Sequence, residues 1–295
     1  MHISVCICTY KRHALLERLL RDVVKQETEG EFGYSIVVAD NDRDESASWV
    51  THRVALTSPV AIRYCVEPRQ NIAMARNMAL ANASGDFIAF LDDDELPPRD
   101  WLLSLYRACV RHEADGVLGP VRPLFEQHPI PEWIVKGRFF ERPEHPTGYE
   151  LAWRETRTGN VLFRRKLIDH CEQPFSPEFG AGGEDQAFFK RLIAKDATFV
   201  WCNEAPVHEL VPPERCRRAY FLKRALQRGQ AEKGLANGRD IAKSVIAIPL
   251  YTAMLPFLLL LGQHRLMRYL IKLCDHAGRL MGVLGYKPLG PTYRT

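Results

Sequence analysis

Three consecutive aspartates, Asp92, Asp93 and Asp94, directly follow the apolar run Phe87–Leu91. Neighbouring carboxylates repel one another, and each one that loses its water is destabilising unless a positive charge compensates it. Mg²⁺ and Mn²⁺ prefer hard carboxylate oxygens, so a divalent cation is a natural partner for such a cluster. An acidic surface turn that caps the next helix is the alternative interpretation of the triplet by itself.

Strand-like and helix-like segments alternate along the first 120 residues. Near-continuous apolar strands separated by amphipathic helices are typical of a mainly parallel sheet that is covered by helices on both faces. The predicted strands are Ile3–Thr9, Tyr34–Asp40, Val60–Glu67, Asp86–Leu91 and Gly116–Pro120, and the predicted helices are Ala14–Gln26, Asn71–Ala83 and Arg99–His112.

Polar clusters fall at the carboxyl ends of three of these strands, which is where such sheets bind ligands. They are Thr9-Tyr10, Asp40-Asn41-Asp42 and the aspartate triplet. We therefore expect the three clusters to line one crevice. If strand geometry continues through the triplet, Asp92 and Asp94 share one face and Asp93 points to the other.

A metal bound at a strand end suits a reaction in which a diphosphate gathers charge as it leaves. In such a site Asp40 can accept a hydrogen bond from a uracil N3–H or a ribose hydroxyl. Arg76 and Asn77, on the helix that starts at Asn71, can reach the base or the phosphates. Asp92 can bind the ribose while Asp94 holds the metal.

A second acidic cluster, Glu184-Asp185, follows Gly182-Gly183 and begins the helical run Ala187–Ala194. Glycines allow close backbone approach, and a helix N-terminus favours the charged form of a carboxylate. Beside a nucleotide site, Asp185 is the candidate general base for an attacking hydroxyl, with Glu184 in support. A plain helix cap is the alternative.

Further candidates lie outside these clusters. His208, at the end of a strand pair around Thr198–Val207, is a candidate metal or phosphate ligand, with a purely structural histidine as the alternative. Arg224 and Arg228 lie four residues apart on a basic helix and are candidates to bind the diphosphate, or else form a solvated face. The segment Pro120–Arg157 is predicted to be long and irregular and rich in proline and aromatic residues. Such loops are usually functional, and a covering flap filled with ordinary packing aromatics is the alternative. The candidate acceptor contacts are Trp133, Gly159 and Asn160, the last two opening a strand at Gly159–Phe163.

Charge is distributed unevenly over the 295 residues. Residues 1–214 carry 25 Lys+Arg against 33 Asp+Glu, whereas residues 215–295 carry 15 against 3. A basic tail on an acidic body indicates that the tail faces something anionic, either phosphate or a lipid surface.

The tail also contains an uncharged apolar stretch, Ser244–Gln263, interrupted by Pro249 and Pro256 and followed by the amphipathic segment Leu266–Leu284. Its length lies at the lower end of the range for a membrane span. Basic residues flank it on both sides, so the positive-inside rule gives no clear crossing. The pattern favours a re-entrant or in-plane anchor, with a true span and a buried soluble helix as the alternatives.

The eight cysteines include no CxxC pair and lie mostly in apolar runs. They are predicted to be small buried side chains in a reducing compartment, without a structural zinc. Because Met1 leads straight into a strand-like run, there is no room for a signal peptide, and the domain is expected on the cytosolic side.

Several motifs together resemble family 2 glycosyltransferases of the GT-A fold, and in particular bacterial exopolysaccharide glucosyltransferases of the succinoglycan type. They are Val5–Arg12, Val38–Asp42, Asn71–Asn77, Phe90–Glu95 and Gly182–Asp185, and the resemblance covers roughly residues 1–230. It implies inverting transfer from a nucleoside-diphosphate sugar, usually a UDP-sugar, with Mg²⁺ or Mn²⁺. The QxxRW motif of processive members is missing, which favours transfer of a single sugar.

The resemblance also implies roles for residues. Asp40 matches the uracil-binding aspartate, Asp92 and Asp94 match the DxD pair, and Asp185 matches the catalytic base. The remaining donor-binding candidates stand within or beside the matched motifs and are Thr9, Tyr10, Arg12, Asn71, Arg76, Asn77 and Asp93.

These observations predict a GT-A catalytic domain over residues 1–214, with a nucleotide-sugar half at 1–120 and an acceptor half at 121–214. A basic helical segment at 215–240 and membrane-associating helices at 241–295 follow. The expected activity is transfer of a hexose, such as glucose, from a UDP-sugar to a lipid-linked or glycan acceptor in bacterial surface polysaccharide synthesis. The expected location is the cytoplasmic face of the inner membrane, with peripheral or monotopic attachment and no nucleic-acid partner.

Two other functions fit part of the pattern. A sugar-1-phosphate nucleotidyltransferase also uses a metal and a related sheet, but normally has a glycine-rich loop after its first strand, and Thr9–His13 contains no glycine. A non-catalytic glycan-binding protein would keep the fold without turnover, and the intact set of Asp92, Asp94 and Asp185 disfavours it.

Overall fold

The computed structural model describes residues 1–179, 183–231 and 238–286. The chain forms two compact units. Unit 1 is built from Met1–Arg122 and Arg142–Glu209, and unit 2 from Pro123–Glu141 and the described residues after Leu210.

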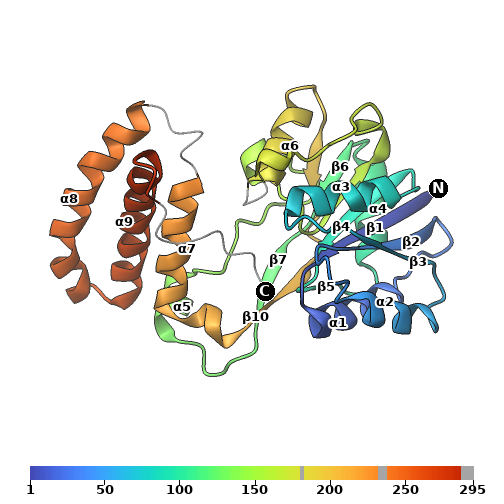
Figure 1. The fold of residues 1–295 in the computed structure, drawn as a ribbon, viewed down its shortest axis with the longest axis horizontal. Coiled ribbons are helices and arrows are strands. Elements are labelled where there is room, and N and C mark those ends of the chain that lie inside the picture. The colour runs from blue at the N-terminus through green and yellow to red at the C-terminus, as the bar shows by residue number, and fades with distance from the viewer. Residues whose placement is uncertain (180–182, 232–237, 287–295) are drawn as a thin grey trace. The chain divides into compact units, whose positions relative to one another are not determined.

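A seven-stranded sheet in the order β3-β2-β1-β4-β8-β6-β9 forms the centre of unit 1 (Figure 1). Strands β1, β2, β3 and β4 run parallel to one another, and β8 is antiparallel to both of its neighbours, β4 and β6. The bounds are β1 (His2–Thr9), β2 (Gly33–Asp40), β3 (Ile62–Val66), β4 (Phe87–Asp92), β6 (Gly116–Leu118), β8 (Val161–Arg164) and β9 (Phe199–Trp201).

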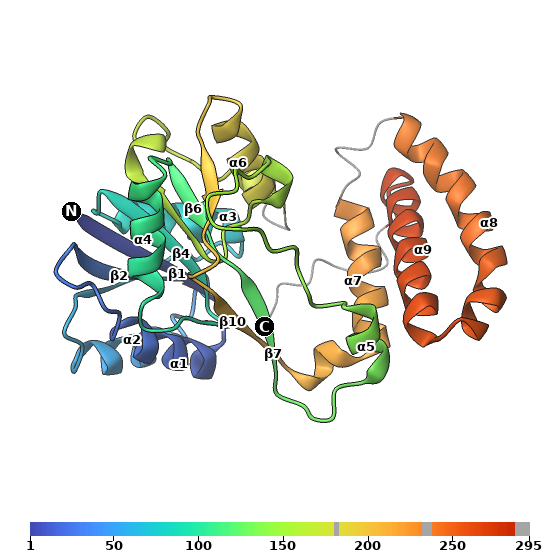
Figure 2. The same ribbon diagram turned by 180° about the vertical axis from the view of Figure 1, so that it is seen from behind.

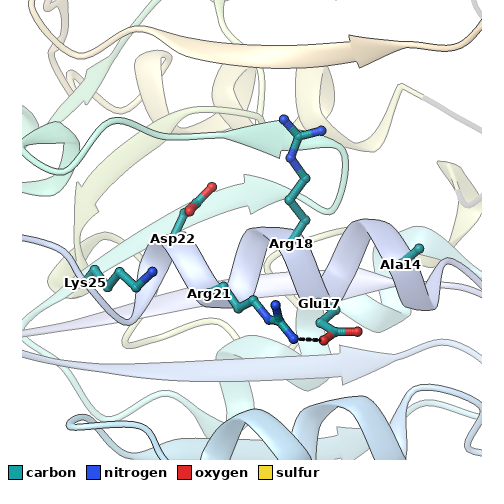
Figure 3. A pocket seen from close by; sticks show the side chains of 6 residues that line it. All are labelled: Ala14, Glu17, Arg18, Arg21, Asp22 and Lys25. Carbon is teal, nitrogen blue, oxygen red and sulfur yellow. Dashed lines mark hydrogen bonds and ion pairs between the residues drawn. The ribbon is translucent and has the colours of Figure 1, made fainter. Parts of the chain in front are cut away.

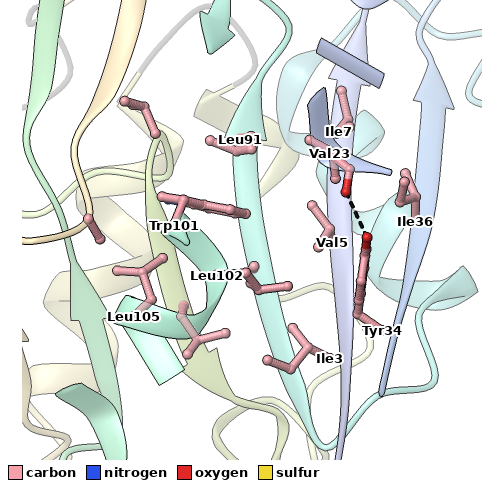
Figure 4. Close-up of a cluster of buried hydrophobic side chains, with 14 of the residues drawn as sticks. Ile3, Val5, Ile7, Val23, Tyr34, Ile36, Leu91, Trp101, Leu102 and Leu105 are labelled. Atoms are coloured by element: carbon pink, nitrogen blue, oxygen red, sulfur yellow. Dashed lines mark hydrogen bonds between the residues drawn. The ribbon is translucent and has the colours of Figure 1, made fainter. Parts of the chain in front are cut away.

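Helices cover both faces of this sheet, as the near-continuous apolar strands predict. On one face Ile3, Val5 and Ile7 pack against α1, α2 and α4, and on the other Cys6, Val37 and Ala39 pack on the side of α3 and α6. Figure 4 shows the first cluster, in which the buried Tyr34 hydroxyl donates to the carbonyl of Val23 at 2.9 Å. The bounds are α1 (His13–Val23), α2 (Ser48–Ala55), α3 (Ile72–Asn82), α4 (Trp101–Arg111) and α6 (Glu184–Ile193).

The predicted elements of the first 120 residues are all present, with ends that differ by up to three residues. Four short elements were not predicted: α2, β5 (Glu95–Leu96), β7 (Val121–Phe125) and α5 (Glu132–Gly137). The segment Pro120–Arg157 is therefore less irregular than its composition suggests. Strands β5 and β7 flank β10 (Val207–Val211) in a three-stranded sheet of the order β5-β10-β7.

Unit 2 contains α5 and three longer helices, α7 (Arg218–Ala231), α8 (Gly238–Leu260) and α9 (Gln263–Val283) (Figure 2). The turn Leu261-Gly262 joins α8 to α9. Helix α8 continues through both Pro249 and Pro256. Among the described residues it is the one helix long and apolar enough to cross a membrane, and 17% of its most apolar window is buried.

Candidate active site

Strand β4 ends at Asp92, and the chain then turns, so strand alternation does not extend through the triplet. Asp93 is buried, and its carboxylate contacts residues at the end of β1. It accepts from Thr9 Oγ1 at 2.8 Å and from Arg12 Nη1 at 2.7 Å. Arg12 Nη1 also lies 3.4 Å from Asp94 Oδ2. Burial raises the pKa of Asp93 to about 6, although Arg12 acts to lower it.

Asp92 is the accessible member of the triplet, with a side chain that is 49% exposed, whereas the side chain of Asp94 is 6% exposed. Glu95 follows the triplet, is buried, and accepts from the backbone N–H of Asp92 at 3.1 Å. Burial, followed by repulsion from the carboxylate of Asp92, raises the pKa of Glu95 well above its usual range. Asp92, Asp94 and Glu95 therefore form an acidic group, in which the carboxylate of Asp92 faces solvent.

Gly159 lies against this acidic group. A Cβ atom at Gly159 would stand 2.5 Å from Glu95 Oε1 and 3.2 Å from Asp92 Oδ2. The antiparallel register that pairs Phe90 with Val161 leads to this contact, since it carries the residues before β8 to the carboxyl end of β4. Only glycine fits there without displacing the two carboxylates.

Arg76, on α3, connects the acidic group to α6. Its guanidinium is buried, forms an ion pair with Glu184, and lies 3.8 Å from Asp92 Oδ1. The Arg76 Cζ atom also stands 5.7 Å from the centre of the Phe175 ring. Arg76 thereby bridges Asp92, the predicted donor-binding carboxylate, and the first turn of α6, which carries the predicted base.

Glu184 and Asp185 occupy the first turn of α6, as predicted. Glu184 is buried, its Oε2 atom has no hydrogen-bond partner among the described residues, and burial raises its pKa. Asp185 is partly exposed and accepts from the backbone N–H of Gln186 at 2.7 Å. Gly182, the other residue of this motif, lies outside the described residues.

Asp40 has a different environment from the one expected for a base-binding residue. It is fully buried, its Oδ1 accepts from the N–H of Asp42 at 3.0 Å, and its Oδ2 accepts from Ala47 N and Tyr64 Oη, each at 2.8 Å. These bonds shape the loop after β2. A direct bond from Asp40 to a nucleotide base stays a prediction and requires one of these contacts to be exchanged.

Three predicted asparagines use their amide groups within the fold. Asn71 caps α3, with Oδ1 accepting from Ala73 N at 3.0 Å, and Asn77 exchanges two hydrogen bonds with the backbone of Phe175. Asn160 is fully buried and donates from Nδ2 to the carbonyls of two loop residues while Oδ1 accepts from Trp101 Nε1 at 2.7 Å. The acceptor contacts of Gly159 and Asn160 stay predictions, and a direct contact from Asn160 requires one of these hydrogen bonds to be exchanged.

The other candidates lie in different surroundings. His208 is exposed on β10, opposite Leu96 of β5. In unit 2, Arg228 forms a bidentate ion pair with Asp275, and Arg224 donates to the hydroxyl of Tyr220 at 2.8 Å. The remaining two are Tyr10, which is partly buried in unit 1, and Trp133, which is 8% exposed and packs on Phe139 and Phe221 in unit 2.

The acidic group suits a divalent ion that shares its ligands with a substrate. Among the described residues no group of three His, Cys, Asp or Glu side chains is arranged to hold a metal. Mg²⁺ is commonly bound by one or two carboxylates together with substrate phosphates, so a complete protein cage is not required. Asp92 and Asp94 would supply these carboxylates, whose repulsion adds to the effect of burial in raising the pKa of Glu95.

Sequence reasoning missed two groups in this region, Glu95 and Arg157. Arg157 is partly buried, its Nε atom has no partner among the described residues, and its Cζ atom lies 5.8 Å from the centre of the Trp201 ring. Burial and the nearby Arg142 lower the pKa of Arg157 to about 10, while Glu95, Glu209 and Asp185 oppose this shift. Its position two residues before Gly159 was the available signal.

A surface hollow of about 560 Å³ lies elsewhere on unit 1. Figure 3 shows that its lining comes from α1 and the turn after it, with Arg21 paired to Glu17. None of the site candidates lines it. Its charged side chains are those of a solvated helix face.

Solved glycosyltransferases of the GT-A fold share this architecture. The structure superposes on mannosyltransferase PcManGT from Pyrobaculum calidifontis, in complex with GDP-Man and Mn²⁺, with a TM-score of 0.64, 18% identity and coverage of 94% of this chain and 86% of that one. For S. aureus TarS 1-349 in complex with UDP, the TM-score is 0.57 and the identity 16%, over 97% and 91% of the two chains. The chain therefore has the GT-A fold.

The chain belongs to glycosyl transferase family 2, whose family profile matches residues 4–170. It is also 35% identical to the succinoglycan biosynthesis protein ExoM of Rhizobium meliloti (strain 1021), over 98% of this chain and 95% of that protein. The predicted family resemblance is confirmed. This membership excludes the alternative that the protein is a sugar-1-phosphate nucleotidyltransferase.

Proposed function

We propose that the protein transfers a hexose, with inversion, from a UDP-sugar to a hydroxyl of a lipid-linked or glycan acceptor during exopolysaccharide synthesis at the inner membrane. The observation that carries this proposal is the position of Arg76, which contacts both Asp92 and Glu184. It links the strand-end carboxylates suited to a nucleotide sugar with the helix start that presents Asp185. The residues that we propose to bind the donor and the residue that we propose as the base thus belong to one connected group of side chains.

In the proposed reaction Asp185 removes the proton from the acceptor hydroxyl. The hydroxyl oxygen forms a bond to the anomeric carbon as the bond from that carbon to the UDP oxygen breaks on the opposite face. Asp92 orients the donor, and Arg76 holds Glu184 and Asp92 in place. Asp92 and Asp94 would hold a divalent ion, which would supply positive charge against the departing diphosphate.

Relatives support this choice of substrates. ExoM is named for succinoglycan biosynthesis, TarS has been solved with UDP and PcManGT with GDP-Man and Mn²⁺. The UDP-sugar is our choice because of the sequence resemblance to succinoglycan-type enzymes. The apolar helix α8 supports a membrane-linked acceptor.

The base assignment is tested with Asp185→Asn, which keeps the shape but removes the proton acceptor. We expect transfer to fall at least about 100-fold, because general base catalysis contributes about that much or more. UDP binding, measured by calorimetry, should stay within about two-fold. Asp196→Asn is the matched control, since Asp196 is exposed and outside the site. Full activity in the Asp185 variant would refute the assignment.

A further inference from the structure

Helix α8 presents exposed apolar side chains along its length. Of its residues, Ser244 and Leu258 are described as buried. The exposed apolar ones are between 55% and 85% exposed and are Val245, Ile246, Leu250, Phe257, Leu259 and Leu260. Ile246, Leu250, Phe257 and Leu260 share one helical face by their spacing. An exposed apolar surface of this extent marks an interaction site.

The opposite side of α8 packs against α9. Near the start of α8, Ser244 Oγ lies 3.0 Å from His276 Nδ1 and accepts from Arg279 at 3.1 Å. In the middle, the rings of Tyr251 and Tyr269 are 5.4 Å apart. With the short turn between them, the two helices form an antiparallel hairpin in contact over much of its length (Figure 2).

Charges on α9 argue against an orientation in which α8 crosses a bilayer. Helix α8 is roughly 34 Å long and could span the hydrocarbon by length alone. Helix α9 would have to cross beside it, and it carries Arg268, Lys272, Asp275 and Arg279. Asp275 is also paired with Arg228 of α7, so a third, basic helix would follow. Charged side chains at the centre of a bilayer are strongly unfavourable.

The ends of α8 complement an anionic lipid surface. Arg239 and Lys243 at its start and Arg265 just after its end are exposed. Between Ser244 and Gln263 the chain has no charge. Basic residues that flank an apolar face attract anionic headgroups while the face enters the acyl boundary.

Both prolines of α8, Pro249 and Pro256, are on its exposed side. Each lacks the N–H that would bond to the carbonyl four residues earlier, at Val245 and Thr252. Such carbonyls need a partner, and hydrocarbon offers none, whereas the membrane interface contains water. This again favours a shallow position.

We propose that α8 lies in the plane of an anionic lipid bilayer, with its apolar face in the acyl boundary and α9 on the aqueous side. This rests on the proposed function only in that the enzyme works at a membrane. It does not depend on the donor, the acceptor or the catalytic residues.

Binding is tested by flotation of the intact protein with phosphatidylcholine vesicles, with and without phosphatidylglycerol. We expect tighter binding to the anionic vesicles and at least a ten-fold loss with Phe257→Asp. Leu56→Asp is the matched control, since Leu56 of unit 1 is 86% exposed and Phe257 is 70% exposed. Equal binding of the wild type and the Phe257 variant, or equal loss in the control, would overturn the proposal.

Orientation is tested with Ala242→Cys and Leu261→Cys, placed at the two ends of α8, where both side chains are exposed. Polyethylene glycol maleimide is added to inside-out vesicles and to spheroplasts, with wild type as the background. We expect both positions to react in the same preparation. Reaction of the two ends from opposite sides would establish a span and overturn the proposal. Phe257→Asp should retain transfer to a water-soluble acceptor, which separates this result from a failure of the proposed function.

Discussion

Arg12 compensates two of the three aspartates, and Arg76 lies beside the third. The residue types of the triplet indicated its chemistry, but the sequence did not indicate which cations would lie next to it. Arg12 was predicted to bind the donor, and in the structure it supports Asp93. The pairing depends on how the end of β1 meets the end of β4, which is a contact between residues more than eighty positions apart.

Gly159→Ala tests the close contact with the acidic group. The added Cβ would lie 2.5 Å from Glu95 Oε1, so the carboxylates of Glu95 and Asp92 must move. We expect the KM for the UDP-sugar to rise at least about ten-fold, with a stability loss of about 1–3 kcal/mol for overpacking. Gly238→Ala is the control, because a Cβ there meets nothing within 4 Å. Unchanged kinetics in a folded Gly159 variant would argue against a donor site here.

Asp93 predicts a pH dependence of stability. Its pKa is raised from 3.8 to about 6, so the folded state favours the protonated acid. The raised pKa stabilises the folded state by up to about 3 kcal/mol below about pH 4, and this stabilisation is lost as the pH rises through about 6. In EDTA, the melting temperature of wild type relative to Asp93→Asn should therefore fall across that window. A difference that stays flat, as expected for Asp196→Asn, would contradict the raised pKa.

At the scale of elements, the long periodic segments were predictable and the short ones were not. Helix α1 shows its buried face as a repeating pattern of leucines. Strand β5 has only two residues, and its existence depends on pairing with β10 more than a hundred residues later. Helix α2 buries three residues, Val50, Thr51 and Val54, which is too few for a clear period.

The buried ion pair between Arg76 and Glu184 couples α3 to α6. Arg76→Ala leaves a buried carboxylate uncompensated, which costs about 3–5 kcal/mol. We expect a large drop in melting temperature, and a smaller further effect when Glu184→Gln is added. Arg107→Ala removes exposed pairs with Glu29 and Glu31 and is expected to cost about 1 kcal/mol or less. Additive effects at Arg76 and Glu184 would show that the two helices are not coupled there.

The whole molecule consists of two compact units, and only part of this division can be predicted from the sequence. The change from an acidic body to a basic tail predicts a boundary near residue 214, and unit 2 includes the described residues from Leu210 onward. Residues 123–141 also belong to unit 2, which the sequence placed in the acceptor half. Their membership depends on packing of Trp133 and Ile134 with Val211 and Met267, which no local pattern reveals.

Metal and nucleotide are expected to bind cooperatively to the intact protein. A divalent ion held by Asp92 and Asp94 would leave coordination positions open for water and for the oxygens of the diphosphate. We expect UDP to tighten Mn²⁺ binding at least about ten-fold in calorimetry, and Mn²⁺ to tighten UDP binding by the same factor. Uridine, which lacks phosphates, is the control and should show no coupling. Tight Mn²⁺ binding without nucleotide would place the ion elsewhere.

Strand β8 enters the sheet in the direction opposite to β4. The residues before it, including Gly159, therefore lie against Asp92 and Glu95, although in a parallel sheet the residues after each strand would do so. The first part of the loop that precedes β8 hydrogen-bonds to β9 through Gly148, Tyr149 and Leu151, whereas residues 152–157 lie outside the strand pairings. We therefore expect that exchange of residues 152–157 between family members would alter acceptor preference while the strand pairing of the seven-stranded sheet is kept.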